Sequence, residues 1–296
     1  MEGQLCCPSL FVKTMKILKI CLLTIIIALG LFSVSCFLYP TISNIINEHY
    51  NESTINEYDS NVDSVPEKEI TTRFAQAIQY NQIIATDYFN DGKIEYESIL
   101  NNYNNILNFG NGLIGYVEIP SISVKLPFYH GESEEVLKKG AAHLEQTSFP
   151  IGGLNTHACI SAHSGYPTQK FFDDIDELES GDFIYIKILN RTITYKVSGS
   201  EVIEPTESSK LKVEKGKDYL TLITCYPYGI NSHRLLVHAE HVNSRELESA
   251  TFDEIKSHTN AKRNHYMPII WLVIGCTAFL LIIGLIILQK KKRARK

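Results

Sequence analysis

The chain has 296 residues and a formal net charge of −5, with 28 Lys and Arg residues against 33 Asp and Glu residues. This acidic balance, without a basic stripe in the central segment, excludes nucleic acid as an expected partner. Hydrophobic residues make up 44% of the chain. They include two long uncharged runs near the two ends, which excludes a single soluble domain.

The two apolar runs are residues 20–39 and 268–288. Each is long enough to cross a hydrocarbon core about 30 Å thick at about 1.5 Å per residue. Lysines precede the first run in residues 1–19, and residues 289–296 form a basic tail. The excess of Lys and Arg predicts a two-pass protein of the cell membrane, with both termini cytoplasmic and residues 40–267 outside. A cleaved signal peptide is the alternative for the first run, although its apolar region would be unusually long.

The segment between the first span and the central domain changes character once. Residues 40–69 are rich in Asn, Ser, Glu and Asp without an apolar period, which predicts a solvated stalk. Residues 70–111 contain two stretches of apolar residues near helical spacing and are predicted to be a helical segment. The first helix is expected to end in the polar stretch 86–92, and the second at the Gly-Asn-Gly turn 110–112.

Residues 112–242 have the pattern of a mainly β domain. About eight short β-type runs bounded by Gly and Pro follow one another without a βαβ rhythm or an internal repeat. This pattern predicts a closed eight-stranded, mainly antiparallel β-barrel with short helices near residues 132–139 and 171–178. Residues 243–267 are expected to be a juxtamembrane linker to the second span.

A candidate nucleophile and a candidate cation lie in one predicted hairpin, TLITCYPYGINSHRLLVHAE. Its first strand ends at Cys225 and its second begins near Arg234, so both side chains can face one reacting carbonyl. The alternative is a buried core cysteine and a surface arginine. Cys159, the other cysteine of the outer segment, lies in an apolar strand and is expected to be a small buried side chain. A disulfide between the two is chemically permitted, but a domain of this size does not need one.

A thiol nucleophile needs a nearby imidazole, and His163 is the candidate. It directly follows the apolar strand THACISA and precedes a Ser-Gly pair, so a barrel strand would deliver it to the rim. The other histidines lie in the stalk, inside strands or next to the second span. No Cys/His pair has the close spacing typical of zinc, and the acidic cluster 173–176 lacks an EF-hand loop. We therefore expect no metal and no cofactor.

These motifs resemble those of sortases, a family of cysteine transpeptidases. The hairpin is similar to the family's TLxTC strand with its downstream Arg, and ISAHSGYPTQKFFDDIDELESGDFIYI resembles the segment that holds the family's histidine. GYVEIPSISVKLPFYHG and LKKGAAHLEQTSFPIGGLNTH resemble the early strands. The resemblance covers about residues 112–242. It implies a sortase-type barrel in which Cys225 is the nucleophile, His163 the general acid and base, and Arg234 the oxyanion stabiliser.

Within the family, TCYPYGINSHRLLVHAE and the second span resemble class C, the pilus-assembling sortases. Members of this class have an N-terminal lid with an Asp-Pro-aromatic motif over the active site. The candidate lid here is Asp87-Tyr88-Phe89, in which Asp87 and Phe89 fit the motif and Tyr88 replaces the rigid proline. An ordinary loop at the end of a helix is the alternative interpretation.

The resemblance implies cleavage of an LPxTG-like sorting signal at its Thr through a Cys225 thioester, followed by transfer to an amine. The implied partners are pilin or surface proteins with such signals, an amine acceptor and the membrane. A pilin lysine is the expected acceptor. A housekeeping sortase that attaches surface proteins to a peptidoglycan precursor, a thiol hydrolase and a non-catalytic membrane-tethered binding module are the alternatives.

Overall fold

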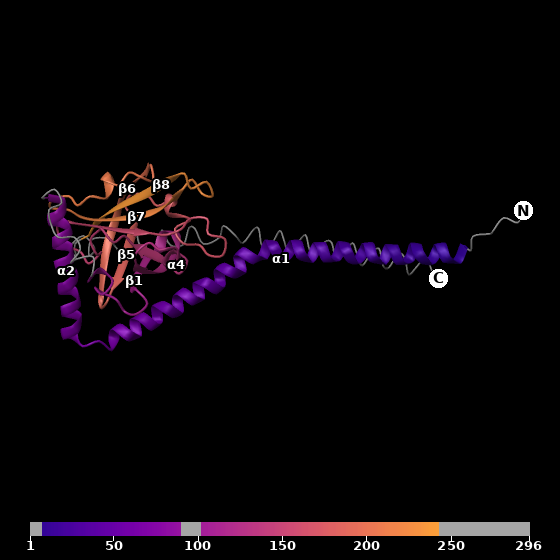
Figure 1. Ribbon diagram of the computed structural model, residues 1–296, viewed down its shortest axis with the longest axis horizontal. Coiled ribbons are helices and arrows are strands. Elements are labelled where there is room, and N and C mark those ends of the chain that lie inside the picture. The colour runs from indigo at the N-terminus through magenta and orange to yellow at the C-terminus, as the bar shows by residue number, and fades with distance from the viewer. Residues whose placement is uncertain (1–7, 90–101, 243–296) are drawn as a thin grey trace, which may run out of the picture.

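The computed structural model describes residues 8–89 and 102–242, which form two long helices and a β-barrel (Figure 1). Helix α1 (Pro8–Asp63) extends far beyond the barrel at its N-terminal end, and helix α2 (Glu67–Phe89) lies across the barrel's other side. The predicted second span, the linker before it and the basic tail lie outside the described residues.

Eight strands close into a barrel in the order β1-β2-β3-β4-β7-β8-β6-β5. The β2–β3 and β4–β7 pairs are parallel, whereas the others are antiparallel, so the predicted closed and mainly antiparallel barrel is confirmed. The strands are β1 (Leu113–Ile119), β2 (Val124–His130), β3 (Ala141–His143), β4 (Thr156–Ser161), β5 (Phe183–Ile188), β6 (Arg191–Ile203), β7 (Asp218–Tyr226) and β8 (His233–His241). Short helices α4 (Glu134–Leu137), η1 (Pro120–Ile122), η2 (Ile175–Glu177) and η3 (Ser209–Leu211) join them.

Strand alternation separates an inner core from a smaller outer cluster. Leu220 and Leu222 of β7 belong to the main core that fills the barrel. Ile223, on the opposite face of the same strand, packs outside it in a second buried cluster. The members of this outer cluster are Cys159, Ile203, Ile223 and Leu236, with Leu144 and Leu211 packed against them. The expectation that Cys159 is a small buried side chain is confirmed.

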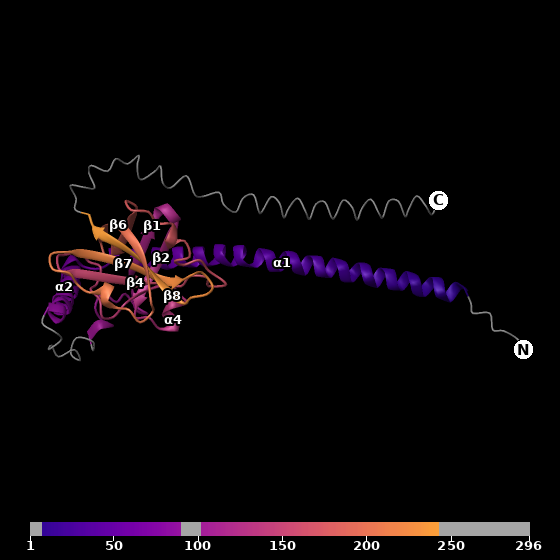
Figure 2. The same ribbon diagram turned by 90° about the horizontal axis from the view of Figure 1, so that it is seen from above.

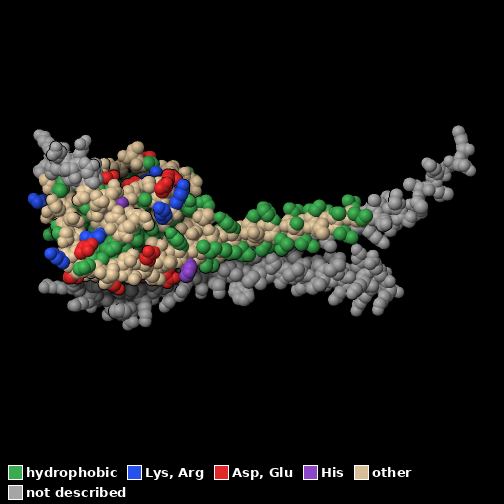
Figure 3. All heavy atoms as spheres, turned by 60° about the horizontal axis from the view of Figure 1, so that its bottom comes forward, with side chains coloured by type: hydrophobic (Ala, Val, Ile, Leu, Met, Phe, Trp, Pro, Cys, Tyr) green, Lys and Arg blue, Asp and Glu red, His purple; other side chains and the backbone are tan. Residues whose placement is uncertain are grey.

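The N-terminal part of α1 is the candidate membrane span. Among the described helices, α1 has a long apolar stretch sufficient to cross a membrane, and none of that stretch is buried in the protein. Apolar side chains line the face of this part of the helix that is visible in Figure 3. One N-terminal apolar helix is therefore present where the first span was predicted.

The prediction of a solvated stalk over residues 40–69 is wrong, because α1 continues through this segment to Asp63. Its buried side chains Asn51, Ile55, Tyr58 and Val62 recur every three or four residues and pack on the barrel. The Tyr58 hydroxyl donates to the carbonyl of Ile114 and accepts from the backbone of Leu189, both at 2.8 Å. The polar composition belongs to the exposed face of a docked helix.

Helix α2 ends at Phe89, within the polar stretch 86–92 where its end was predicted. It is fixed to the barrel through Asn81, which exchanges hydrogen bonds with the backbone N–H and carbonyl of Phe149 at 2.7 and 3.0 Å. The lid candidates Asp87 and Phe89 are therefore helical at the backbone level, and their side chains lie outside the described part of the structure.

Candidate active site

Strands β4, β7 and β8 lie side by side, and their register determines which predicted site residues meet. Cys225 is the last residue but one of β7 and pairs directly with Arg234 near the start of β8. Directly opposite residues in an antiparallel pair project from the same face, with Cβ atoms about 4.5–5.5 Å apart. The predicted nucleophile and the predicted cation therefore share one face at one end of the hairpin.

His163 joins this pair from the other side of β7. In the parallel β4–β7 pair Ser161 lies opposite Ile223, so two further residues on each strand bring His163 opposite Cys225. The pairing continues past the end of β4, because Ala162 N–H donates to the Ile223 carbonyl at 3.1 Å and Thr224 Oγ1 donates to the Ala162 carbonyl at 2.8 Å. The structure thus brings His163, Cys225 and Arg234 to the same end of three adjacent strands.

The Arg234 guanidinium is oriented by its own loop. Its Nη1 donates to the carbonyl oxygens of His233 at 2.9 Å and Asn231 at 3.3 Å. Among the described residues it has no carboxylate partner. Because an arginine has five N–H donors, the donors on Nε and Nη2 remain available at the Cys225 end of the strand.

The His163 ring is held by aromatic packing rather than by a hydrogen bond. It stacks on Tyr166 with centroids 5.2 Å apart and an interplanar angle of 11°, and Phe171 approaches it edge-on at 6.1 Å. Its Nε2 atom is buried and has no hydrogen-bond partner among the described residues. No hydrogen bond at this nitrogen therefore fixes the tautomer of the ring.

The two outer cysteines differ in a way that separates a reactive thiol from a packing one. Cys159 is fully buried in the outer cluster, and burial raises the pKa of its thiol far above the usual range. Cys225 is partly exposed and no disulfide joins it to Cys159. Of these two thiols, only Cys225 is accessible beside an imidazole and a guanidinium.

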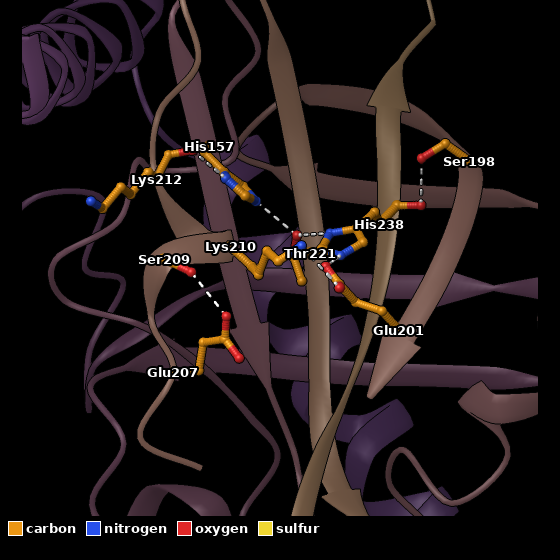
Figure 4. A network of polar contacts seen from close by, with 9 residues as sticks. All are labelled: His157, Ser198, Glu201, Glu207, Ser209, Lys210, Lys212, Thr221 and His238. Atoms are coloured by element: carbon orange, nitrogen blue, oxygen red, sulfur yellow. Dashed lines mark hydrogen bonds and ion pairs between the residues drawn. The ribbon is translucent and has the colours of Figure 1, made fainter. Parts of the chain in front are cut away.

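A polar chain on the same outer face was missed by the sequence analysis (Figure 4). Thr221 Oγ1 lies 2.7 Å from His157 Nε2 and 2.9 Å from His238 Nδ1, while His238 Nε2 lies 3.2 Å from Glu201. Glu201 also pairs with Lys210 at 3.2 Å. Thr221 is four residues from Cys225, or about 13 Å along the strand, so this chain does not touch the thiol.

The chain instead ties the connection between β6 and β7 to the barrel. His157 Nδ1 contacts the Lys212 carbonyl at 2.9 Å, and Lys210 lies in η3 of the same connection. Burial lowers the pKa of His157. Strand alternation in the sequence puts His157 on the same face as Cys159 and His163. Its connection to Glu201 in β6 and His238 in β8 depends on strand pairing between distant segments, which the sequence pattern does not give.

Comparison with known proteins agrees with this geometry. A family model described as the sortase domain matches residues 117–242. Sortase A of Bacillus anthracis is 31% identical over 133 residues, which cover 45% of this chain and 61% of that protein. Sortase A of Staphylococcus aureus (strain NCTC 8325 / PS 47) is 32% identical over 117 residues, covering 38% of this chain and 55% of that protein. The chain thus spans between about half and three fifths of these curated relatives.

Solved structures match over almost their whole length. Sortase C1 from Streptococcus agalactiae is 38% identical with a TM-score of 0.60, covering 64% of this chain and 98% of that chain. Sortase C from Clostridium perfringens SM101 is 43% identical with a TM-score of 0.55, covering 64% and 99%. The chain belongs to the sortase family. This sortase therefore has class C sortases among its structural relatives, and the resemblance stated from its motifs is confirmed.

Proposed function

We propose that this sortase is a membrane-anchored cysteine transpeptidase of the pilus-assembling kind. The observation that supports the proposal is the strand register that puts Cys225 between His163 and Arg234 on one face. A Clostridium perfringens sortase C structure, 43% identical to this chain, is described with the C-terminal cell wall sorting motif. The proposed donor is accordingly a protein with an LPxTG-like sorting signal.

In the first half-reaction the Cys225 thiolate attacks the threonine carbonyl carbon of the sorting signal, forming a C–S bond as the carbonyl π electrons move to oxygen. Arg234 donates N–H groups to this oxyanion from Nε and Nη2. When the intermediate collapses, the C–N bond breaks and the leaving amine takes a proton from His163. The product is a thioester on Cys225.

In the second half-reaction an acceptor amine attacks the thioester carbon. His163 takes the proton that the amine loses, and the C–S bond breaks to return the Cys225 thiolate. The new bond is an amide, or an isopeptide when the acceptor is a lysine side chain. Both protein groups end in the state in which they began, so the cycle needs no metal and no redox partner.

The proposed acceptor is the ε-amine of a pilin lysine, which rests on the likeness to sortase C structures. Attachment of surface proteins to a peptidoglycan precursor is the second candidate, because the curated relatives of Bacillus anthracis and Staphylococcus aureus are named sortase A. We further propose that α1 anchors the protein with its N-terminus cytoplasmic, and that residues 268–288 form a second span.

The test is acyl-enzyme capture on the full chain in detergent. An LPxTG peptide should give a covalent adduct that hydroxylamine releases, and Cys225→Ala should abolish it while the matched Cys159→Ala leaves it intact.

The trapped adduct is then offered pilin, a peptidoglycan stem peptide with a free amine, or buffer alone. Transfer to a pilin lysine supports the proposal, and transfer to the stem peptide supports the housekeeping role. Release to water in the presence of both amines indicates a hydrolase, while absence of any adduct contradicts sortase activity.

A further inference from the structure

Helix α1 meets the barrel at the loop that follows His163. Ser43 Oγ and Asn47 Nδ2 both donate to the carbonyl oxygen of Thr168, at 2.8 and 2.7 Å. The backbone N–H of Lys170 donates to Asn44 Oδ1 at 3.0 Å. Three side chains on one face of α1 therefore hold the backbone of two loop residues more than a hundred positions away in the chain.

The same loop is tied to His163 at its other side. Phe172 N–H donates to the His163 carbonyl at 3.0 Å. The Asp173 carboxylate accepts from the backbone N–H groups of Gly165 at 3.0 Å and Phe171 at 2.8 Å. The loop from residue 163 to residue 173 is thus a closed unit, fixed from within by Asp173 and from outside by α1.

The residues held by α1 flank the rings that hold the imidazole. Thr168 is two residues from Tyr166, which stacks on the His163 ring. Lys170 is next to Phe171, whose ring meets the His163 ring in an edge-to-face contact. Because no hydrogen bond among the described residues fixes the His163 ring, its orientation depends on these two rings. A shift of the loop backbone would be passed directly to the imidazole.

The position of these contacts on α1 links them to the membrane anchor. Ser43 follows Pro40 by three residues, directly beyond the apolar part of the helix. Ser43, Asn44 and Asn47 are partly buried, whereas the neighbouring residues 41, 42, 45 and 46 are exposed. Figures 1 and 2 both show α1 extending away from the barrel toward its N-terminal end. Among the described residues, the hydrogen bonds to this loop are the first that α1 makes to the barrel after its apolar part.

We infer that Ser43, Asn44 and Asn47 are positioning residues for His163, through which the membrane-anchoring helix sets the orientation of the imidazole. The inference rests on the proposed function, in which His163 transfers protons. It specifies a direction for each bond: Asn44 must accept a hydrogen bond, whereas Asn47 must donate one. Residues on the opposite face of the same helical turns have no such requirement.

The two asparagines provide a charge-matched test. Asn44→Asp keeps an acceptor for the Lys170 N–H and loses only the bond that Asn44 Nδ2 donates to the exposed Glu48 carboxylate at 2.8 Å within α1. Asn47→Asp instead replaces a donor with an acceptor that faces the Thr168 carbonyl oxygen. In the full chain in detergent, Asn47→Asp should lower kcat for LPxTG-peptide transfer about tenfold to a hundredfold with KM within about twofold. It should also change the pH profile of kcat/KM, while Asn44→Asp stays within about twofold of the parent. Thr41→Ala, on the exposed face, is the helix control.

A second measurement does not depend on activity. Hydrogen exchange at the Phe172 amide, which bonds the His163 carbonyl, should be faster in Asn47→Asp and unchanged in Asn44→Asp and Thr41→Ala. The inference is overturned if Asn47→Asp exchanges like the parent, or if it loses activity with the parent's pH profile, which would indicate general destabilisation. Failure of the parent itself to form an adduct contradicts the proposed function instead, and the exchange result still decides whether α1 fixes the loop.

Discussion

Arg234 shows at the scale of a single residue why charge alone does not define the proposed site. Two of its N–H contacts go to carbonyl oxygens of its own loop, and these leave the rest of the planar group fixed beside Cys225. Lysine has the same charge but no fixed fork of donors. We therefore expect Arg234→Lys to lower kcat for peptide transfer about 10²–10³-fold, in the range for loss of an oxyanion donor. Steady-state kinetics check this, with Arg191→Lys in β6 as the matched control, and near-parental activity of Arg234→Lys would contradict the assignment.

The direction of each hydrogen bond in the outer polar chain follows from the Lys212 carbonyl at one end and the Glu201 carboxylate at the other. The Lys212 carbonyl can only accept, so His157 donates from Nδ1 and, because burial lowers its pKa, its neutral Nε2 accepts from the Thr221 hydroxyl. The Thr221 oxygen then accepts from His238 Nδ1, and His238 Nε2 donates to Glu201. In this scheme Thr221 Oγ1 is both a donor and an acceptor. Burial acts to raise the pKa of Glu201, but its bonds with Lys210 and His238 outweigh this and lower it.

Thr221 is the residue on which this chain depends, because its hydroxyl both donates and accepts while completely buried. We expect Thr221→Val, which is similar in shape, to leave two ring nitrogens unsatisfied and to reduce the free energy of unfolding by about 1–3 kcal/mol. Urea unfolding of the full chain measures this. Thr192→Val at an exposed position of β6 is the control and should change stability by less than about 0.5 kcal/mol. Equal effects of the two substitutions would contradict the bonding scheme.

At the scale of elements, α1 is a packing element of the domain as well as an anchor. The buried Tyr58 hydroxyl donates to the Ile114 carbonyl in β1 and accepts from the Leu189 N–H directly after β5. Burial raises the pKa of this hydroxyl beyond the usual range. We expect Tyr58→Phe to cost about 1–3 kcal/mol of unfolding free energy because both backbone groups lose their partner. Tyr50→Phe on the exposed side of α1 is the matched control for urea unfolding, and an equally stable Tyr58→Phe variant would show that α1 is only loosely docked.

The candidate lid is also a matter of how elements end. We propose that Asp87 and Phe89, the last turn of α2, cover Cys225 in the resting enzyme. Alanine at either position should then increase the rate at which iodoacetamide alkylates Cys225, because the thiol becomes more accessible. Thr86→Ala, one residue earlier, controls for a general effect on the helix. Alkylation at the parent rate in both lid variants would show that this turn does not cover the site.

The sequence predicted what depends on local patterns and missed what depends on distant pairing. Alternating apolar runs identified the strands on either side of the Cys225 loop, and the shared face of Cys225 and Arg234 follows from that hairpin alone. Neither the parallel β4–β7 pairing nor the resulting position of His163 beside Cys225 could be obtained from spacing, because the paired residues Thr156 and Asp218 lie 62 positions apart in the chain. The part of α1 that packs on the barrel was missed because only four of its side chains are buried, and the many exposed polar residues between them hide their helical spacing.

At the scale of the whole molecule, buried histidines make the barrel sensitive to acid. His143 is fully buried, contacts Tyr103 and the Ser148 carbonyl, and stacks on Phe149. Burial lowers its pKa to about 3, and burial also lowers the pKa values of His130 and His157. These groups remain neutral in the folded state at a pH where the unfolded chain has already bound their protons.

The sign of the effect follows from this difference in proton binding. Below about pH 6.5 the unfolded state binds more protons than the folded state, so the free energy of unfolding falls as the pH is lowered from 6.5 toward 3. One such histidine contributes at most about 1.4 kcal/mol per pH unit. We expect His143→Gln to be less stable than the parent at pH 7. On acidification its free energy of unfolding should fall more slowly than the parent's, by up to about 1.4 kcal/mol per pH unit, because one fewer proton is taken up on unfolding. Urea unfolding across this pH range measures the slope, and His49→Gln, at an exposed position of α1, should keep the parental one. An unchanged slope in His143→Gln would show that its imidazole is not held neutral by the fold.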